Sequence, residues 1–188
     1  MALEHALLVS LSEQPASGLD LARRFGRSIG FFWHATHQQI YRVLARMDGD
    51  GWVTVTEVAQ SGRPDKKVYA VSPAGARVLA DWLAEPTPME PLRSELAVKM
   101  RGAAFGDRDA VLDVVRANLA EHRLRLDHYE QLERRQQAHH GAHPGAHPGA
   151  DAVPLTGHAL VQYLVLRGGI RTERFWVDWL TEYLEAHA

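Results

Sequence analysis

The sequence predicts a mainly α-helical protein with one small β-hairpin, divided into an N-terminal and a C-terminal region. Apolar residues recur at helical spacing through most of the 188 residues. One stretch, residues 52–72, instead holds two short runs rich in β-branched residues on either side of a turn with glycine and proline. A proline-rich segment, EPTPMEP, then precedes a purely helical pattern. We therefore expect a first domain at 1–85, a hinge at 86–91 and a helical second domain at 92–188.

The composition excludes several classes of protein. The chain has no cysteine, which rules out disulfides, cysteine nucleophiles and cysteine-ligated metal centres. Its formal net charge is −2, which rules out a uniformly basic nucleic-acid coat protein. No apolar run approaches the roughly 20 residues that a membrane-spanning helix needs, and the start of the chain lacks the features of a secretory signal. We expect a cytoplasmic protein that does not bind membranes.

Two short helices are expected before the first irregular segment. Leucines at helical spacing indicate the first helix, and the sequence QPASG ends it. Ser17 has the side chain of a helix N-cap, so the second helix, GLDLARRFGRS, should begin directly after it. This second helix would bury Leu21 and Phe25.

A third helix is expected in the sequence THQQIYRVLARM, where Thr36 is suited to cap its start. Its apolar residues are spaced as on a helix that packs against a core: Ile40, Val43, Leu44 and Met47. Polar residues occupy the remaining positions: His37, Gln38, Gln39, Arg42 and Arg46. No acidic residue lies between Asp20 and Asp48, so the basic charge of this region is local. The helix therefore has one side for the core and one that carries unneutralised polar groups.

The hairpin and a fourth helix complete the first domain. The strands are expected in WVTVTEV and KVYAVS, and the turn between them carries Arg63, Lys66 and Lys67. Pro73 fits the first turn of the fourth helix. Three helices followed by a two-stranded hairpin is the order of elements in a winged helix–turn–helix domain.

This order gives the polar side of the third helix a function. A major groove about 12 Å wide admits one helix, in which glutamine can pair with adenine and arginine with guanine. Basic residues of the hairpin can reach phosphates or an adjacent minor groove. We expect contacts with double-stranded DNA from these residues: Thr36, His37, Gln38, Gln39, Tyr41, Arg42, Arg46, Arg63, Lys66 and Lys67. The alternative is a solvated helix face beside a charged turn.

The second domain is expected to be an antiparallel arrangement of helices. The first is expected in PLRSELAVKMRGAAFG, and a long helix follows in residues 107–137, where Leu112, Leu119 and Leu126 repeat every seven positions. Such a seam packs against another long helix, of the same chain or of a second one. A His-Pro-Gly-Ala repeat at 138–153 has no apolar anchors, so we expect a flexible tether there.

The last predicted helix begins near Gly157 and carries more large apolar residues than one thin domain can bury. We expect a dimer interface formed by Leu160, Leu164, Phe175, Trp179 and Tyr183. The pair Gly168 and Gly169 in the same helix indicates a close helix approach or a kink.

Six stretches of the sequence resemble regulators of the PadR type. They are ALLVSL, SGLDLARRF, THQQIYRVLARM, DGWVTV, GRPDKKVYAVSPAG and LADWLAEP, which together cover most of residues 1–85. The combination of QIYRVL with GRPDKKVY and SPAG is specific for the family. The C-terminal half resembles the helical dimerisation region of that family in the order and length of its helices, and in FWVDWL near the end.

This resemblance implies a cytoplasmic bacterial homodimer that represses transcription from a palindromic operator and releases it in response to a small molecule or another signal. Gln39 and Tyr41 match the motif of the DNA-reading helix, which implies that Tyr41 contacts a phosphate; its alternative role is to cover the edge of the core. The wing motif includes Arg63 and the two lysines after it. Two departures stand out: Leu19 occupies a position where the family often has tyrosine, and the His-Pro-Gly repeat is not a usual family feature.

Two kinds of small-ligand site were considered. The aromatic residues near the hinge and the dimer surface could line a pocket for a flat aromatic or apolar effector, with core packing as the alternative role of each: Trp33, Trp82, Phe105, Trp176 and Trp179. The imidazoles of the repeat suit nickel, zinc or copper: His139, His140, His143 and His147. Ordering a flexible segment around a metal is unfavourable and no carboxylate supports these histidines, so we expect no metal site and no cofactor.

An enzyme is not expected, because the sequence has no Gly-rich phosphate loop, no nucleophile elbow and no His-Glu-x-x-His motif. The alternative function is a helical protein-interaction module without specific DNA binding. Such a module would not need the basic third helix and hairpin, so we favour a DNA-binding regulator.

Overall fold

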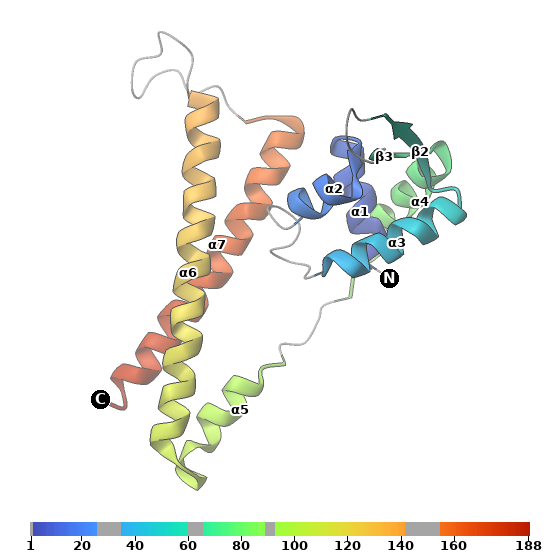
Figure 1. Ribbon diagram of the computed structural model, residues 1–188. Coiled ribbons are helices and arrows are strands. Elements are labelled where there is room, and N and C mark those ends of the chain that lie inside the picture. Colours follow the sequence, from blue (N-terminus) through green and yellow to red (C-terminus); the bar gives the residue numbers. More distant parts are fainter. Residues whose placement is uncertain (1, 26–34, 60–65, 89–92, 142–154) are drawn as a thin grey trace. The chain divides into compact units, whose positions relative to one another are not determined.

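The structure, a computed structural model, describes residues 2–25, 35–59, 66–88, 93–141 and 155–188. The chain forms two compact units, residues 1–89 and 90–188. Each unit has its own hydrophobic core, so each is described by itself (Figure 1).

The first unit contains four helices and a small sheet among its described residues (Figure 1). In chain order the elements are α1 (Ala2–Glu13), β1 (Ala16–Ser17), α2 (Gly18–Phe25), α3 (His37–Gly49), β2 (Val53–Val58), β3 (Lys66–Val71) and α4 (Pro73–Ala84). The order of helices and hairpin confirms the predicted winged helix–turn–helix.

The sheet has one strand more than the sequence predicted. Its order is β1-β3-β2 and all neighbours are antiparallel. The extra strand β1 pairs Ala16 with Tyr69 and Ser17 with Val68. The two-residue strand is too short to leave a pattern in the sequence, because alternation needs at least four residues.

The core of the first unit lies under α3 and holds that helix in place. The predicted apolar stripe is confirmed, since Ile40, Leu44 and Met47 are almost fully buried and Val43 packs against the same core. Leucines of α1 and the predicted Leu21 and Phe25 of α2 complete this core: Leu7, Leu8, Leu11, Leu21 and Phe25. The opposite side of α3 is consequently the side that faces away from the core.

Side-chain caps fix where the helices of this unit begin. The predicted cap of α2 is confirmed, because Ser17 Oγ accepts a hydrogen bond from the Asp20 amide at 3.2 Å. Ser72 Oγ caps α4 by accepting from the Gly75 amide at 3.0 Å, and it donates to the Gly51 carbonyl at 2.6 Å. The cap of α4 therefore also joins this helix to the start of the hairpin.

The second unit consists of helices in its described residues: α5 (Glu95–Gly102), the 3-10 helix η2 (Ala103–Phe105), α6 (Arg108–Gly141) and α7 (Gly157–Glu185). The long helices α6 and α7 lie antiparallel, side by side (Figure 1). Of the predicted seven-residue seam of α6, Leu112 and Leu119 are buried and Leu126 is partly buried. Val115 and Leu119 share a core cluster with Leu180 of α7. The helix α6 continues to Gly141, so residues 138–141 are helical rather than part of the predicted tether. Residues 142–154 of that tether lie outside the described part of the chain.

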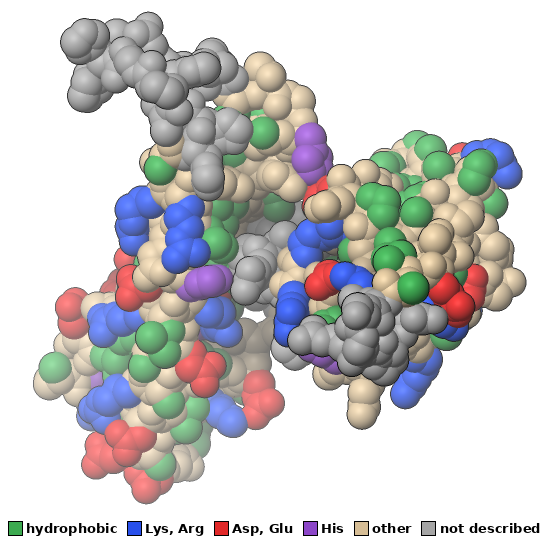
Figure 2. Space-filling model, turned by 45° about the horizontal axis from the view of Figure 1, so that its top comes forward, with side chains coloured by type: hydrophobic (Ala, Val, Ile, Leu, Met, Phe, Trp, Pro, Cys, Tyr) green, Lys and Arg blue, Asp and Glu red, His purple; other side chains and the backbone are tan. Residues whose placement is uncertain are grey.

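Polar groups also cross between α6 and α7. His122 Nδ1 lies 2.5 Å from Glu173 Oε2, and Arg125 Nε lies 3.4 Å from the other oxygen of the same carboxylate. Further along, Arg174 pairs with Glu130 at 2.7 Å and Arg167 with Glu133 at 3.3 Å. Basic and acidic side chains accordingly lie among one another on the surface of this unit (Figure 2).

None of the described helices has both the length and the apolar character needed to cross a membrane.

Candidate DNA-binding surface

The start of α3 is fixed by a capping box that uses two of the predicted DNA contacts. Thr36 Oγ1 accepts from the Gln39 amide at 3.2 Å, and Gln39 Oε1 accepts from the Thr36 amide at 2.8 Å. A bidentate contact with adenine uses both the oxygen and the nitrogen of a glutamine amide. Gln39 would therefore have to break its hydrogen bond with the Thr36 amide before it could make a bidentate contact with adenine. While the capping box is intact, only the NH2 group of Gln39 can donate a hydrogen bond to a base.

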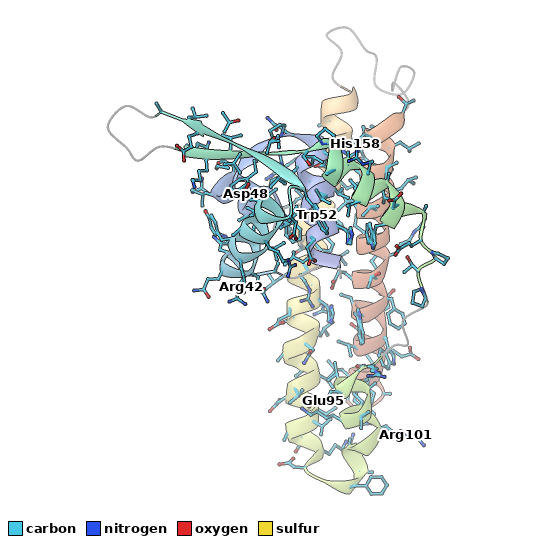
Figure 3. All side chains as sticks on the ribbon, turned by 90° about the vertical axis from the view of Figure 1, so that its right-hand side faces the viewer. Arg42, Asp48, Trp52, Glu95, Arg101 and His158 are labelled. Carbon is cyan, nitrogen blue, oxygen red and sulfur yellow. The ribbon has the colours of Figure 1, made fainter. Side chains whose placement is uncertain are left out.

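The first half of α3 presents polar side chains to solvent. His37, Gln38 and Arg42 are exposed, and no hydrogen bond or ion pair joins them to another described residue. Arg42 extends outward from α3 (Figure 3). The first turn of α3 contains no acidic residue, so the positive end of the helix dipole is not neutralised there. These features suit contact with the acceptors and phosphates of a duplex.

Arg46, near the end of α3, has a different environment. Its guanidinium forms an ion pair with Glu4, a residue of α1 that is only 4% exposed. The sequence pattern shows no acidic partner for this arginine on its own helix, and the structure supplies one from 42 positions away. Glu4 was not among the residues that the sequence singled out, because nothing local links it to Arg46.

Tyr41 lies at the edge of α3 nearest to the start of α2. A Cβ atom added to Gly18 would lie 2.4 Å from a carbon of the Tyr41 ring, so the ring packs directly over this glycine. Nevertheless 46% of Tyr41 is exposed. The ring thus covers the edge of the domain, and the predicted contact between its hydroxyl and a phosphate stays a prediction.

Of the three DNA contacts predicted on the hairpin, two are lysines that form ion pairs and the third is an arginine outside the described residues. Lys66 and Lys67 are the first two residues of β3. Lys66 Nζ lies 2.6 Å from Asp20 Oδ2, and this hydrogen bond, followed by the one from Ser17, lowers the pKa of the Asp20 carboxyl. Lys67 lies 3.9 Å from Glu57, and both side chains are mostly exposed. Arg63 lies outside the described residues.

The predicted effector-pocket residues that the structure describes belong to both units, and the pocket itself stays a prediction. Trp176 and Trp179 come together in the second unit, with ring centroids 5.3 Å apart, and Trp176 also stacks on His122. Trp82 belongs to the first unit, where it stacks on His5 at 4.5 Å. Phe105 of η2 is 93% exposed. Trp33 lies outside the described residues.

Of the five dimer residues predicted on α7, three are exposed and two pack inside their own unit. Leu160, Leu164 and Phe175 are exposed, with 57% of Leu164 accessible to solvent. Trp179 and Tyr183 instead pack against the core of their own unit, and the Tyr183 hydroxyl donates to the Met100 carbonyl at 2.9 Å.

The histidines His143 and His147 lie outside the described residues, as do the side chains of His139 and His140.

Comparison with known proteins identifies both units. Residues 7–81 match the model of the transcriptional regulator PadR-like family, and residues 92–188 match that of the virulence activator alpha C-terminal region. The probable transcriptional regulator Rv1176c of Mycobacterium tuberculosis is 51% identical, over 99% of this chain and 97% of that protein. The negative transcriptional regulator PadR of Bacillus subtilis is 28% identical, over 97% of this chain and 95% of that protein.

Among the solved structures that match nearly the whole chain are a PadR protein and a virulence activator. Bacillus subtilis PadR in complex with operator DNA has a TM-score of 0.79 at 25% identity, covering 99% of each chain. The virulence activator AphA of Vibrio cholerae has a TM-score of 0.74 at 28% identity, covering 100% of each chain. The chain therefore belongs to the PadR-like family of DNA-binding transcriptional regulators and is not an enzyme.

Proposed function

We propose that the protein is a homodimeric repressor that binds a palindromic operator and releases it when a small aromatic or apolar effector binds. The observation that carries the proposal is the solvent side of α3, where His37, Gln38 and Arg42 stand without partners among the described residues, on a helix held from behind by a buried apolar stripe. The protein would act on DNA in the cytoplasm.

In the proposed mechanism, each subunit inserts α3 into a major groove. Recognition helices contact base edges chiefly from their N-terminal part; here Gln38 lies in the first turn of α3, and Arg42 follows one turn later. Arginine matches the two acceptors of guanine, and glutamine matches the donor and acceptor of adenine. Lys67, on the exposed side of the hairpin, would contact the flanking phosphate backbone. Phosphate contacts hold the protein on the duplex, and the base contacts select the sequence.

A second copy of the chain is the partner that the exposed side of α7 fits best. The apolar residues there recur at helical spacing over more than three turns: Leu160, Val161, Leu164, Val165 and Phe175. Gly168 lies within this stripe, and a Cβ atom added to it would meet nothing within 4 Å. A stripe with a gap of this kind suits close contact with another helix, because glycine lets two backbones approach. A dimer would set the two copies of α3 about 34–36 Å apart, or a multiple of that distance, along the operator.

Repression and effector release are proposed by analogy with a relative. Bacillus subtilis PadR is named a negative regulator and has also been crystallised with p-coumaric acid. An effector changes DNA binding only if it prefers one of two arrangements of the protein. Trp176 and Trp179 are the predicted pocket residues that lie together, so their fluorescence is the natural signal for a titration with phenolic compounds. Saturable quenching would support an effector site, and flat titrations across the panel would contradict it.

Activation is the second candidate function, because residues 92–188 match a region named for a virulence activator. A promoter carrying the operator, placed before a reporter gene, distinguishes the two. Expression that falls when the protein is supplied supports repression, and expression that rises supports activation.

DNA binding is tested by selecting bound duplexes from a random-sequence library. The enriched duplex and a scrambled one are then compared by fluorescence anisotropy at several salt concentrations. We expect a palindromic enriched sequence, tight binding to it alone, and an affinity that falls steeply with salt. Equal, weak binding to both duplexes would contradict the sequence-specific function. No binding at low salt would favour a protein-interaction module instead.

A further inference from the structure

Glu4 is a buried carboxylate whose purpose the proposed function does not by itself explain. It lies in the first turn of α1, and its side chain is 6% exposed. An ionised carboxylate is very unfavourable in such a position unless a cation compensates it. Among the described residues, the one cation that pairs with Glu4 is Arg46, in the last turn of α3.

This pairing decides what Arg46 can do. If the guanidinium moved onto a DNA phosphate, Glu4 would be left buried without its cation, next to an additional negative charge. Arg46 is also in the last turn of α3, whereas base contacts are made mainly from the start of a recognition helix. Although 51% of the Arg46 side chain is exposed, its position and its partner both direct it toward α1.

The same pair supplies a constraint that the apolar stripe lacks. Burial of Ile40, Leu44 and Met47 holds α3 on the core, but the hydrophobic effect has no direction and tolerates small rotations of a helix. An ion pair with a guanidinium is directional. The helix dipoles favour both charges, since Glu4 lies at the N-terminal end of α1 and Arg46 at the C-terminal end of α3. The pair therefore ties the end of α3 to a second helix, as the capping box ties its start.

We propose that Glu4 is a positioning residue of the DNA-binding surface, which holds Arg46 on α1, fixes the direction in which α3 presents Arg42, and keeps Arg46 off the DNA. This inference rests on the proposed insertion of α3 into a major groove. It removes Arg46 from the predicted DNA contacts and leaves Arg42 as the arginine of α3 that reads the operator.

The test uses the full chain and four proteins: wild type, Glu4→Gln, Arg46→Met, and the double variant Glu4→Leu/Arg46→Met. The double variant replaces the ion pair, whose carboxylate is buried and whose guanidinium is half exposed, by apolar side chains of similar size, a change that folded proteins often tolerate. Each protein is measured by thermal unfolding, and by anisotropy on the selected operator and on scrambled DNA across a salt series.

The expected results differ between the variants. Arg46→Met leaves the buried Glu4 carboxylate without a cation, so the melting temperature and the operator affinity should both fall. The affinity should fall by about tenfold or more. The double variant should regain both, with operator affinity within about threefold of wild type and an unchanged salt slope. Glu4→Gln frees Arg46 for a phosphate, so binding to scrambled DNA should strengthen and its salt slope should steepen by about 0.9.

Two results would overturn the inference while the proposed function stands. One is a double variant whose melting temperature recovers while its operator affinity stays low and its salt slope is shallower by about 0.9, because Arg46 would then contact a phosphate. The other is additivity of Arg46→Met and the further single variant Glu4→Leu, measured against the double variant in thermal unfolding, because the pair would then not exist in solution. If the wild type enriches no sequence at all, the proposed function fails and the positioning role falls with it.

Discussion

At the scale of single residues, Arg42 is the side chain of α3 on which sequence recognition should depend most. It is exposed and has no partner among the described residues. Arg42→Ala should weaken operator binding by about 1–3 kcal/mol and relax the preference at one base pair, since the fold does not need this side chain. Arg77→Ala is the matched control, because Arg77 is an exposed arginine of α4 in the same unit. Anisotropy on the operator and on its single-base variants measures both effects; equal losses in the two proteins would mean that the reading surface lies elsewhere.

The residues of α3 also show how far sequence reasoning reaches. The apolar stripe and the cap at Thr36 depend on neighbours three or four positions away, so they were predictable from local spacing. The engagement of Gln39 in the same capping box also follows from the spacing of Thr36 and Gln39, and it competes with the base contact that the sequence predicts for Gln39. The pairing of Arg46 with Glu4 could not be predicted, because it depends on the packing of α1 against α3.

At the scale of elements, α4 is joined to the hairpin by a close approach at Gly75. A Cβ atom there would lie 2.0 Å from the Trp52 carbonyl oxygen, whose hydrogen bond from the Ser72 amide is 3.0 Å long. Gly75→Ala should therefore destabilise the first unit by about 1–3 kcal/mol, despite the better helix propensity of alanine. The matched control is Gly49→Ala at the end of α3, where the added methyl group meets nothing within 4 Å. Chemical denaturation measures both, and equal stability of the two variants would contradict the close approach.

The base of the hairpin is joined to α2 by Asp20 and Lys66, and this link should respond to acid. The pKa of Asp20 in the folded protein is lowered, chiefly by the hydrogen bond with Lys66, then by that with Ser17. A lowered pKa gives stability that is present above the ordinary aspartate value of about 3.9 and is lost as the pH falls through the folded value. Lys66→Met should raise the pKa of Asp20 toward that value and reduce the loss in acid. A carboxyl NMR titration measures this pKa, with Lys67→Met as the control that should leave it unchanged.

The elements themselves were largely predictable, with informative exceptions. Helical spacing predicted the helices α1 to α7, and the hairpin pattern predicted β2 and β3, because apolar periodicity can be read over each of these segments. The strand β1 escaped prediction because it has two residues, and α6 extends into the His-rich segment because helix ends depend on context. The predicted domain boundary already placed Trp82 and Trp176 in different units. The aromatic residues of the predicted pocket share no common spacing along the chain, so the sequence could not show which of them pack together within a unit.

At the scale of the whole molecule, the oligomeric state should depend on Gly168. Among the described residues, a Cβ atom at this position meets nothing within 4 Å, so Gly168→Ala should only strengthen α7, by roughly 0.5–1 kcal/mol. If the exposed stripe of α7 contacts a second copy, Gly168→Gln should weaken the dimer by about tenfold or more, because its side chain keeps the helices apart. Sedimentation equilibrium measures the dissociation constant, and circular dichroism checks that the helices persist. An unchanged dissociation constant would place the dimer contact on another surface.

The polar contacts between α6 and α7 have a consequence for how this unit forms. The partners become closer along the chain toward the junction of the two helices: 58 positions apart for Arg123 and Thr181, 51 for His122 and Glu173, 44 for Glu130 and Arg174, and 34 for Glu133 and Arg167. Closing a shorter loop loses less chain entropy, and each contact that forms shortens the loop for the next. The contacts between α6 and α7 can therefore form one after another, starting near the junction of the two helices. Contacts whose separations shorten in this way favour rapid folding of the helical unit, because the pairs closest along the chain can form first.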